Sequence, residues 1–177
     1  MKIIAVVGTG SGCGKTTVAC RILQAIPGLG AVKISPRDGA SLVEWGAGRP
    51  GKDTDLYVRS GAVPVARIIG PRESVAASWA AISSAFKDRP GVVIEGASAL
   101  DLPGARLVIF IAGAASEAGR EHHNRALALK ADVLMGQSSP GAPWRQGWDP
   151  KNWRPGPVPD VELADTVRAF LAGSSTE

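Results

Sequence analysis

The residues best suited to chemistry lie in a glycine-rich segment near the start of the chain, residues 8–17. This segment follows the apolar residues 3–7 and precedes apolar residues at helical spacing. Glycines let successive backbone N–H groups turn toward one point, and the N-terminus of the following helix adds its positive dipole. In such a loop the Lys15 ammonium reaches the β- and γ-phosphates of a nucleotide, and the Thr16 hydroxyl binds Mg²⁺. We therefore expect a nucleoside triphosphate and Mg²⁺ to bind here.

The spacing in this loop differs by one residue from the pattern G-x-x-x-x-G-K-[ST]. Thr9 stands five positions before Gly14 and the leading glycine is Gly8, so the loop is one residue longer. We expect Cys13 to contribute only its backbone. The predicted nucleotide-binding residues are Gly10, Ser11, Gly12, Cys13, Gly14, Lys15, Thr16, Thr17 and Lys33.

Two charged residues outside the loop are candidates for the same site. Glu95 ends the apolar run 91–94 and would lie at the carboxyl edge of a parallel sheet, where ligands of such folds bind. A carboxylate there binds Mg²⁺ or orients an attacking group. Lys33 lies in or just after a second strand, where it either contacts phosphate or extends its charged end to solvent.

The segment 51–55 has two interpretations. Asp53 or Thr54 caps a helix, because both residue types are favoured at that position. Alternatively, Asp53 or Asp55 reaches Mg²⁺ across the site. The predicted catalytic residues are thus Lys15, Glu95 and Asp53, and the predicted metal ligands are Thr16, Glu95 and Asp53.

The elements that must position these residues follow from the apolar pattern. Apolar runs alternate with segments of helical period, which is typical of a parallel sheet covered by helices on both faces. The predicted strands are 3–7, 31–34, 65–69, 91–95, 107–112 and 132–135, and the predicted helices are 17–26, 53–60, 74–86, 122–131 and 161–171. The unbroken alternation favours a single α/β domain over residues 1–177, a doubly wound, mostly parallel sheet of the P-loop NTPase kind.

Two segments show little periodicity. Residues 35–52 are polar and glycine-rich, and we expect a long functional loop there. Residues 136–159 are rich in Trp and Pro, and we expect an ordered but irregular loop before a closing C-terminal helix. The tryptophans of this second loop, Trp144, Trp148 and Trp153, either pack over the sheet edge or form a lid or a partner surface.

Composition narrows the class of protein. The formal net charge is only +4, and the basic residues are scattered, so a nucleic-acid groove is not expected. Cys13 and Cys20 are too few for a disulfide framework and lack the spacing of a metal site. The adjacent His122 and His123 would face different directions on a helix, so a metal site between them is not expected. No apolar run is long enough to cross a membrane, and we predict a cytoplasmic protein.

Several segments together resemble those of the molybdopterin-guanine dinucleotide biosynthesis protein B family. They are the glycine-rich loop, Lys33 after the second strand, Gly51-Lys52-Asp53-Thr54, Arg59-Ser60-Gly61-Ala62 and Ile94-Glu95-Gly96. The resemblance covers about the first hundred residues. It implies a guanine-nucleotide-binding adaptor, often dimeric, that assists attachment of a nucleotide to the molybdenum cofactor. It also implies that Gly14, Lys15 and Thr16 bind phosphate and Mg²⁺, that Glu95 belongs to the metal site, and that Lys33 and Asp53 lie at the phosphate edge.

The lengthened loop, with Gly8-Thr9 before Gly14-Lys15-Thr16, also resembles that of dethiobiotin synthetase. Two functions therefore follow, beside a third in which the protein is a binding module without turnover, because no residue is clearly a base for an attacking water. The first is an adaptor that binds GTP, hydrolyses it slowly and works with a cofactor-biosynthesis protein, as a homodimer. The second is an ATP-dependent enzyme that activates a small acid held by polar groups of the 35–52 loop. The choice between adenine and guanine stays open, because the Asn-Lys-x-Asp signature is missing and Gln137 could contact either base.

Overall fold

The computed structural model describes residues 1–113, 121–136, 153–155 and 158–173. The strands are β1 (Lys2–Gly8), β2 (Gly30–Pro36), β3 (Leu42–Trp45), β4 (Val65–Gly70), β5 (Val92–Glu95), β6 (Ala105–Ala112), β7 (Val133–Gly136) and β8 (Trp153–Pro155). The α-helices are α1 (Lys15–Ala25), α2 (Asp53–Arg59), α3 (Val75–Ile82), α4 (Glu121–Ala128) and α5 (Asp160–Ala172). Three short 3₁₀ helices are η1 (Arg72–Ser74), η2 (Ser83–Phe86) and η3 (Ala97–Asp101).

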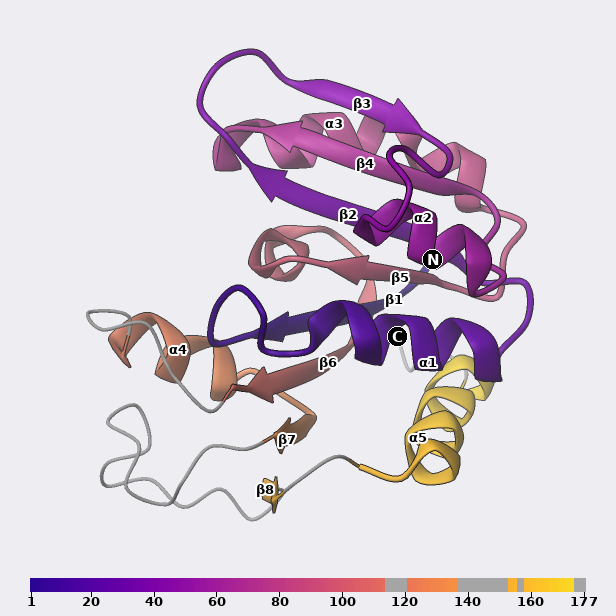
Figure 1. Ribbon diagram of the computed structural model, residues 1–177, viewed down its shortest axis with the longest axis vertical. Helices are drawn as coiled ribbons and strands as arrows, with labels where there is room; N and C mark the ends of the chain where they lie inside the picture. Colours follow the sequence, from indigo (N-terminus) through magenta and orange to yellow (C-terminus); the bar gives the residue numbers. More distant parts are fainter. Residues whose placement is uncertain (114–120, 137–152, 156–157, 174–177) are drawn as a thin grey trace.

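The strands form one sheet in the order β3-β4-β2-β5-β1-β6-β7-β8 (Figure 1). Every neighbouring pair is parallel except β3 and β4. Because β1, β5 and β2 are adjacent and parallel, their carboxyl ends meet at one edge of the sheet. The residues that end these strands are Gly8, Glu95 and Pro36. This edge therefore brings together the predicted phosphate loop, the predicted metal ligand and the segment after Lys33.

Helices cover both faces of the sheet. Side chains alternate along β1, so that Ile4 and Val6 pack on one face against α1, α2 and α5, whereas Ile3 and Val7 pack on the other against α3 and α4. In Figure 1, α1 and α2 lie in front of the strands, and α5 lies beside the end of α1. The runs of Ile and Val in the central strands suit a sheet buried on both sides.

The α/β class and the mostly parallel sheet are confirmed, and the arrangement is consistent with the predicted doubly wound fold. Each predicted strand and helix has a counterpart, with boundaries that shift by a few residues. The predicted helix over 74–86 ends earlier, because the 3₁₀ helix η2 replaces its last turn. Within the described ranges, none of the helices has the length and apolar character that crossing a membrane requires.

Two expectations about loops are wrong in part. The 35–52 segment contains strand β3, which pairs antiparallel with β4 at the edge of the sheet. Only four residues of strand lie there between glycine-rich turns, too few to show a period, and the free edge of β4 supplies the hydrogen bonds. The 136–159 segment contains β8, which pairs with β7. Trp144 and Trp148 lie outside the described residues, as do the side chain of Trp153 and all of Gln137.

Candidate functional site

The loop between β1 and α1 has the backbone geometry of an anion cradle. Gly12 and Gly14 adopt positive φ values of 74° and 98°, which residues with a Cβ rarely adopt. Gly14 is the N-cap of α1, and neither a capping side chain nor an acidic residue of the first turn satisfies the helix N-terminus. The first N–H groups of α1 are therefore available to an anion, and the helix dipole favours negative charge there.

Thr9 accounts for the extra residue in the loop. Its backbone N–H donates to the Ile111 carbonyl at 3.0 Å, which extends the pairing of β1 with β6 by one residue. Its buried hydroxyl accepts a hydrogen bond from the Gly113 N–H at 2.9 Å. Gly8 lies so close to β6 that a Cβ would be 2.5 Å from the Ile111 carbonyl oxygen. The first two residues of the loop thus fix it to the sheet, and the loop turns away only from Gly10 onward.

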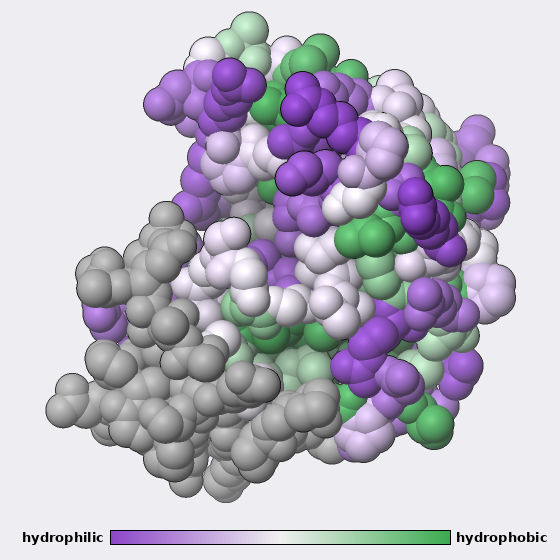
Figure 2. Space-filling model, in the orientation of Figure 1, coloured by the Kyte–Doolittle hydropathy of each residue, from purple (hydrophilic) through white to green (hydrophobic). Residues whose placement is uncertain are grey.

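A cavity of about 570 Å³ opens between this loop and the carboxyl ends of β2 and β5. It is lined by all the predicted nucleotide-binding residues except Cys13, by Asp53 and Glu95, and by Gly8, Ile34, Ser35, Pro36, Gly96, Ala97 and His123. In Figure 2 the outline of the molecule is indented below the turn that follows β2. The volume lies within the range of small-molecule sites, about 300–1,000 Å³.

Glu95 is the buried centre of the site, with an exposed fraction of 1%. Its Oε2 accepts hydrogen bonds from the Thr16 hydroxyl at 2.9 Å and from the Tyr57 hydroxyl. Its Oε1 is paired with the Lys33 ammonium. A buried carboxylate is costly unless its oxygens are paired and hydrogen-bonded, and here both oxygens have partners.

Lys33 joins the two carboxylates of the site. Besides Glu95, its Nζ contacts Asp53 Oδ2 at 2.8 Å. Burial alone would raise the pKa of Asp53, but the hydrogen bond and charge of Lys33, with smaller contributions from Thr16 and Arg67, hold that pKa below its usual value. Asp53 is therefore ionised at neutral pH. Of the two interpretations of Lys33, the structure favours the one in which its charge points into the site.

The Thr16 hydroxyl lies between both carboxylates. Its oxygen is 3.1 Å from Asp53 Oδ1 and 2.9 Å from Glu95 Oε2. A hydroxyl has one proton, so it donates fully to only one of them. Three hard oxygen ligands from separate elements thus converge on one point, as Mg²⁺ requires.

The donor set fits Mg²⁺ that is also held by phosphate. Among the described residues no group of three or more His, Cys, Asp or Glu side chains could hold a metal by itself. Two carboxylates and one hydroxyl leave coordination positions for phosphate oxygens and water, which is the usual arrangement of Mg²⁺ in phosphate-binding sites. The predicted ligands Thr16, Glu95 and Asp53 therefore lie together.

Lys15 and Cys13 differ in where their side chains point. The Lys15 ammonium lines the cavity and donates a hydrogen bond to the Gly10 carbonyl, so it lies across the loop. The Cys13 side chain does not line the cavity; it packs against the core, and its Sγ is 3.4 Å from Lys15 Nζ. The expectation that Cys13 offers only its backbone agrees with this orientation.

The remaining residues of the 51–55 segment support the loop. The N-cap of α2 is Lys52, and the Thr54 hydroxyl donates instead to the Ala47 carbonyl at 2.7 Å. Asp55 accepts from the Gly51 N–H at 2.7 Å and pairs with Arg59 at 3.0 Å. The capping interpretation of Asp53 and Thr54 is therefore wrong, and so is the alternative in which Asp55 reaches the metal.

Sequence reasoning missed two residues. Tyr57 of α2 is fully buried and donates to Glu95; burial, followed by the charge and hydrogen bond of Glu95, raises the pKa of Tyr57, so it stays protonated. His123 lines the cavity from α4, whereas the sequence argued only against a metal site between His122 and His123. A tyrosine that follows Asp53 by four residues shares its helix face, and this spacing was the only available signal for Tyr57.

Comparison of the chain with protein-family models, with curated proteins and with solved structures finds no match. The arguments below therefore rest on the sequence and on the geometry of this molecule.

Proposed function

We propose that the protein binds a nucleoside triphosphate with Mg²⁺ in the cavity between the β1–α1 loop and the ends of β2 and β5, as a P-loop NTPase does. The observation that carries this proposal is the convergence of the Thr16 hydroxyl on Asp53 and Glu95, directly beside the uncapped N-terminus of α1. The cradle supplies N–H donors for phosphate, and the three oxygens supply the ligands for Mg²⁺.

Each charged group then has a defined role. When nucleotide binds, the Lys15 ammonium exchanges the Gly10 carbonyl for the β- and γ-phosphates and neutralises their charge. In the absence of metal, Lys33 neutralises the negative charge of Asp53 and Glu95. Mg²⁺ supplies charge neutralisation at the phosphates. Both oxygens of Glu95 already accept hydrogen bonds, from Thr16, Tyr57 and Lys33, so they are occupied by donors other than an attacking water. We therefore propose slow hydrolysis rather than rapid turnover.

We further propose that the nucleotide is GTP and that the protein acts as an adaptor in biosynthesis of the molybdenum cofactor, in partnership with a cofactor-biosynthesis protein and as a homodimer. This proposal rests on the resemblance of Gly51-Lys52-Asp53-Thr54 and Ile94-Glu95-Gly96 to the corresponding segments of that family. The placement of Asp53 and Glu95 on either side of Thr16 supports it, because the segments that carry the resemblance lie at the candidate site.

The second candidate function is ATP-dependent activation of a small acid. One observation favours it: a further cavity of about 860 Å³ adjoins the first and shares Lys33, Ser35, Pro36 and Asp53 with it. An enzyme of this type needs a second substrate beside the terminal phosphate. A ligand in this cavity would adjoin Lys33 and Asp53, next to the proposed phosphate and Mg²⁺ positions.

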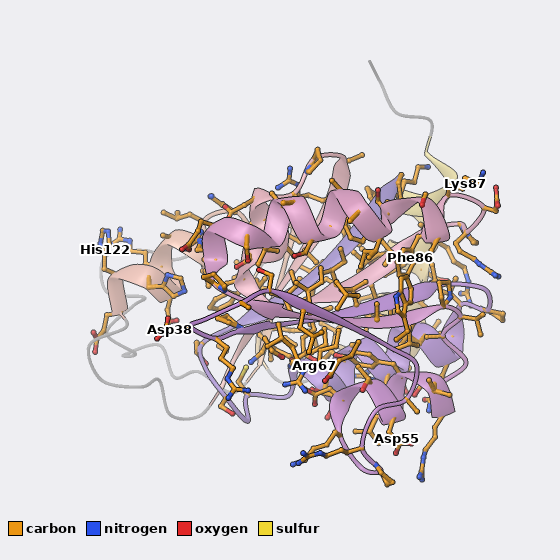
Figure 3. All side chains as sticks on the ribbon, turned by 90° about the horizontal axis from the view of Figure 1, so that it is seen from above. Asp38, Asp55, Arg67, Phe86, Lys87 and His122 are labelled. Carbon is orange, nitrogen blue, oxygen red and sulfur yellow. The ribbon has the colours of Figure 1, made fainter. Side chains whose placement is uncertain are left out.

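The test is calorimetric titration of the protein with GTP and with ATP, each with and without Mg²⁺. We expect Mg²⁺-dependent binding that Lys15→Ala weakens by about 10- to 100-fold, since a charge-assisted hydrogen bond is lost. Lys87→Ala, which removes an exposed lysine far from the cavity, is the control (Figure 3). Preference for GTP favours the adaptor, and preference for ATP favours the activating enzyme. Equal binding by wild type and Lys15→Ala would refute the proposal.

A further inference from the structure

The second cavity has a floor of charged side chains where a sheet face is normally apolar. On the face covered by α2, the earlier residues of β2 and β4, Ala31 and Val65, belong to the core. Two residues later the same face carries Lys33 and Arg67, which are paired in register across the two strands. Like charges directly opposite each other destabilise a sheet. The fold by itself does not explain this pair.

The two cations of the floor have different partners. Lys33 contacts two carboxylates in the first cavity. Arg67 has one, Glu44 of the edge strand, at 3.5 Å, and both side chains are close to half exposed. An exposed ion pair of this kind contributes at most about 1 kcal/mol to the stability of the fold. The Arg67 Nε also donates a hydrogen bond to the Ser35 hydroxyl at 3.0 Å, which fixes the position of the guanidinium in the cavity.

The walls add further positive charge. Arg37 lies on the turn after β2, and Arg49 and Lys52 lie on the segment before α2. Across the described ranges, no carboxylate is paired with any of these three side chains. Figure 2 shows hydrophilic residues gathered at that turn and in front of β4. The cavity is lined by five cationic and three acidic side chains, so its field favours an anion.

The same cavity has an apolar side. Leu42 and Ile69, which are paired in register two residues beyond Glu44 and Arg67, line it together with Ala40 and Pro36. Leu42 is 53% exposed, although it lies on a strand. In Figure 3, Arg67 lies between the strands and α2, whereas Phe86 lies on the opposite side, toward α3. A ligand with a charged end and an apolar body matches this lining.

We propose that the second cavity binds a small organic anion, a carboxylate or phosphate ester carried by an apolar group, with Arg67 as the principal contact of its charged end. Its location beside the terminal phosphate of a nucleotide rests on the proposed function, whereas the anion site itself does not. Lys33 and Asp53 line both cavities, so a ligand here is adjacent to the Mg²⁺ and phosphate positions.

The experiment titrates the full chain, presaturated with Mg²⁺ and a nucleoside diphosphate, with phenyl phosphate and with benzoate by calorimetry. Benzyl alcohol is the uncharged control probe. We expect one or both anions to bind and benzyl alcohol not to bind; stronger binding of phenyl phosphate identifies a phosphate ester, and stronger binding of benzoate a carboxylate. Failure of both anions to bind, or equal binding of benzyl alcohol, would overturn the proposal.

Two arginine variants locate the site. Arg67→Gln should weaken binding of the preferred anion about tenfold. Arg72→Gln is the matched control, because Arg72 is also a partly exposed arginine paired with one exposed carboxylate, Asp101, and it should leave binding unchanged. Unaltered binding by Arg67→Gln would overturn the proposal.

Lys15→Ala separates this inference from the proposed function. If the anion probe still binds Lys15→Ala and is weakened by Arg67→Gln, the anion site stands even where nucleotide binding fails. If Lys15→Ala abolishes binding of the probe and Arg67→Gln does not, the probe occupies the first cavity and the second cavity is not an anion site. Circular dichroism of each variant confirms that it is folded.

Discussion

The two adjoining cavities share lining residues but differ in how closely their charged side chains are paired. One row of the sheet, Glu44, Arg67, Lys33 and Glu95, runs through both in register. At the Glu95 end the charges are buried and paired at short distances, and at the Glu44 end the pair is longer and half exposed. The paired end is already organised without a ligand, whereas the open end has cations in excess. This difference predicts that equal substitutions along the row have unequal effects.

The largest loss of folding stability is expected from Glu95→Gln. The substitution keeps the shape but removes the charge that compensates Lys33, and loss of one partner of a buried pair costs about 3–5 kcal/mol. We expect about 3 kcal/mol, the lower end of this range, because Asp53 still pairs with Lys33. Urea unfolding at neutral pH without nucleotide measures the difference. A loss below about 1 kcal/mol, the most that an exposed pair contributes, would remove the proposed contrast between the two ends.

A smaller effect is expected from Tyr57→Phe, which removes one donor to Glu95 and leaves Thr16 and Lys33 in place. A hydrogen bond to a charged group contributes about 1.5–3 kcal/mol, and we expect the lower value. The same unfolding measurement applies. Because Tyr57 is the only tyrosine, its ultraviolet absorbance also reports its ionisation directly. Its raised pKa predicts that tyrosinate forms only as the protein unfolds in alkali, and tyrosinate in the folded protein near pH 10 would contradict the buried contact.

These two residues show what the sequence could and could not predict. Glu95 was predicted because an apolar run that ends in a carboxylate marks the carboxyl edge of a parallel sheet. Tyr57 was not predicted, because its hydroxyl contacts Glu95 only through the packing of α2 on the sheet, and its spacing from Asp53 does not by itself reveal that contact. Asp53 lies between these cases: the sequence indicated a site residue or a helix cap, and only the position of α2 decides between them.

The second cavity was harder to predict for a related reason. Its polar residues fall in the 35–52 segment, which has no clear period, and strand β3 within it is only four residues long. The sequence indicated only that polar groups of this segment could hold a small acid. It could not place Arg67 opposite Lys33, because register between strands depends on the pairing of the whole sheet.

The wall of the second cavity gives a pH-dependent prediction. Asp55 holds the segment before α2, and the Gly51 N–H, followed by the ion pair with Arg59, outweighs burial and lowers the pKa of Asp55 below its usual 3.8. A carboxyl group whose pKa is lowered by folding stabilises the protein fully at pH values above its usual pKa. This stabilisation is lost as the pH falls through the folded-state pKa. Asp55→Asn should therefore lower the thermal midpoint at about pH 7 and have less effect at about pH 3. Ser84→Ala, at an exposed site, is the control, and an equal loss at both pH values would contradict the role of the charge.

The smallest effect on stability is expected from Glu44→Gln, the same substitution as Glu95→Gln at the exposed end of the row. Its pair with Arg67 is long and solvated, so we expect a change of less than about 1 kcal/mol in urea unfolding. The substitution nevertheless removes the carboxylate that competes for the Arg67 guanidinium. Affinity for the anion probe that binds wild type should therefore rise, by about twofold to fivefold for a pair of this strength. Weaker binding of that probe to Glu44→Gln would mean that Glu44 orients Arg67 rather than competing with the ligand.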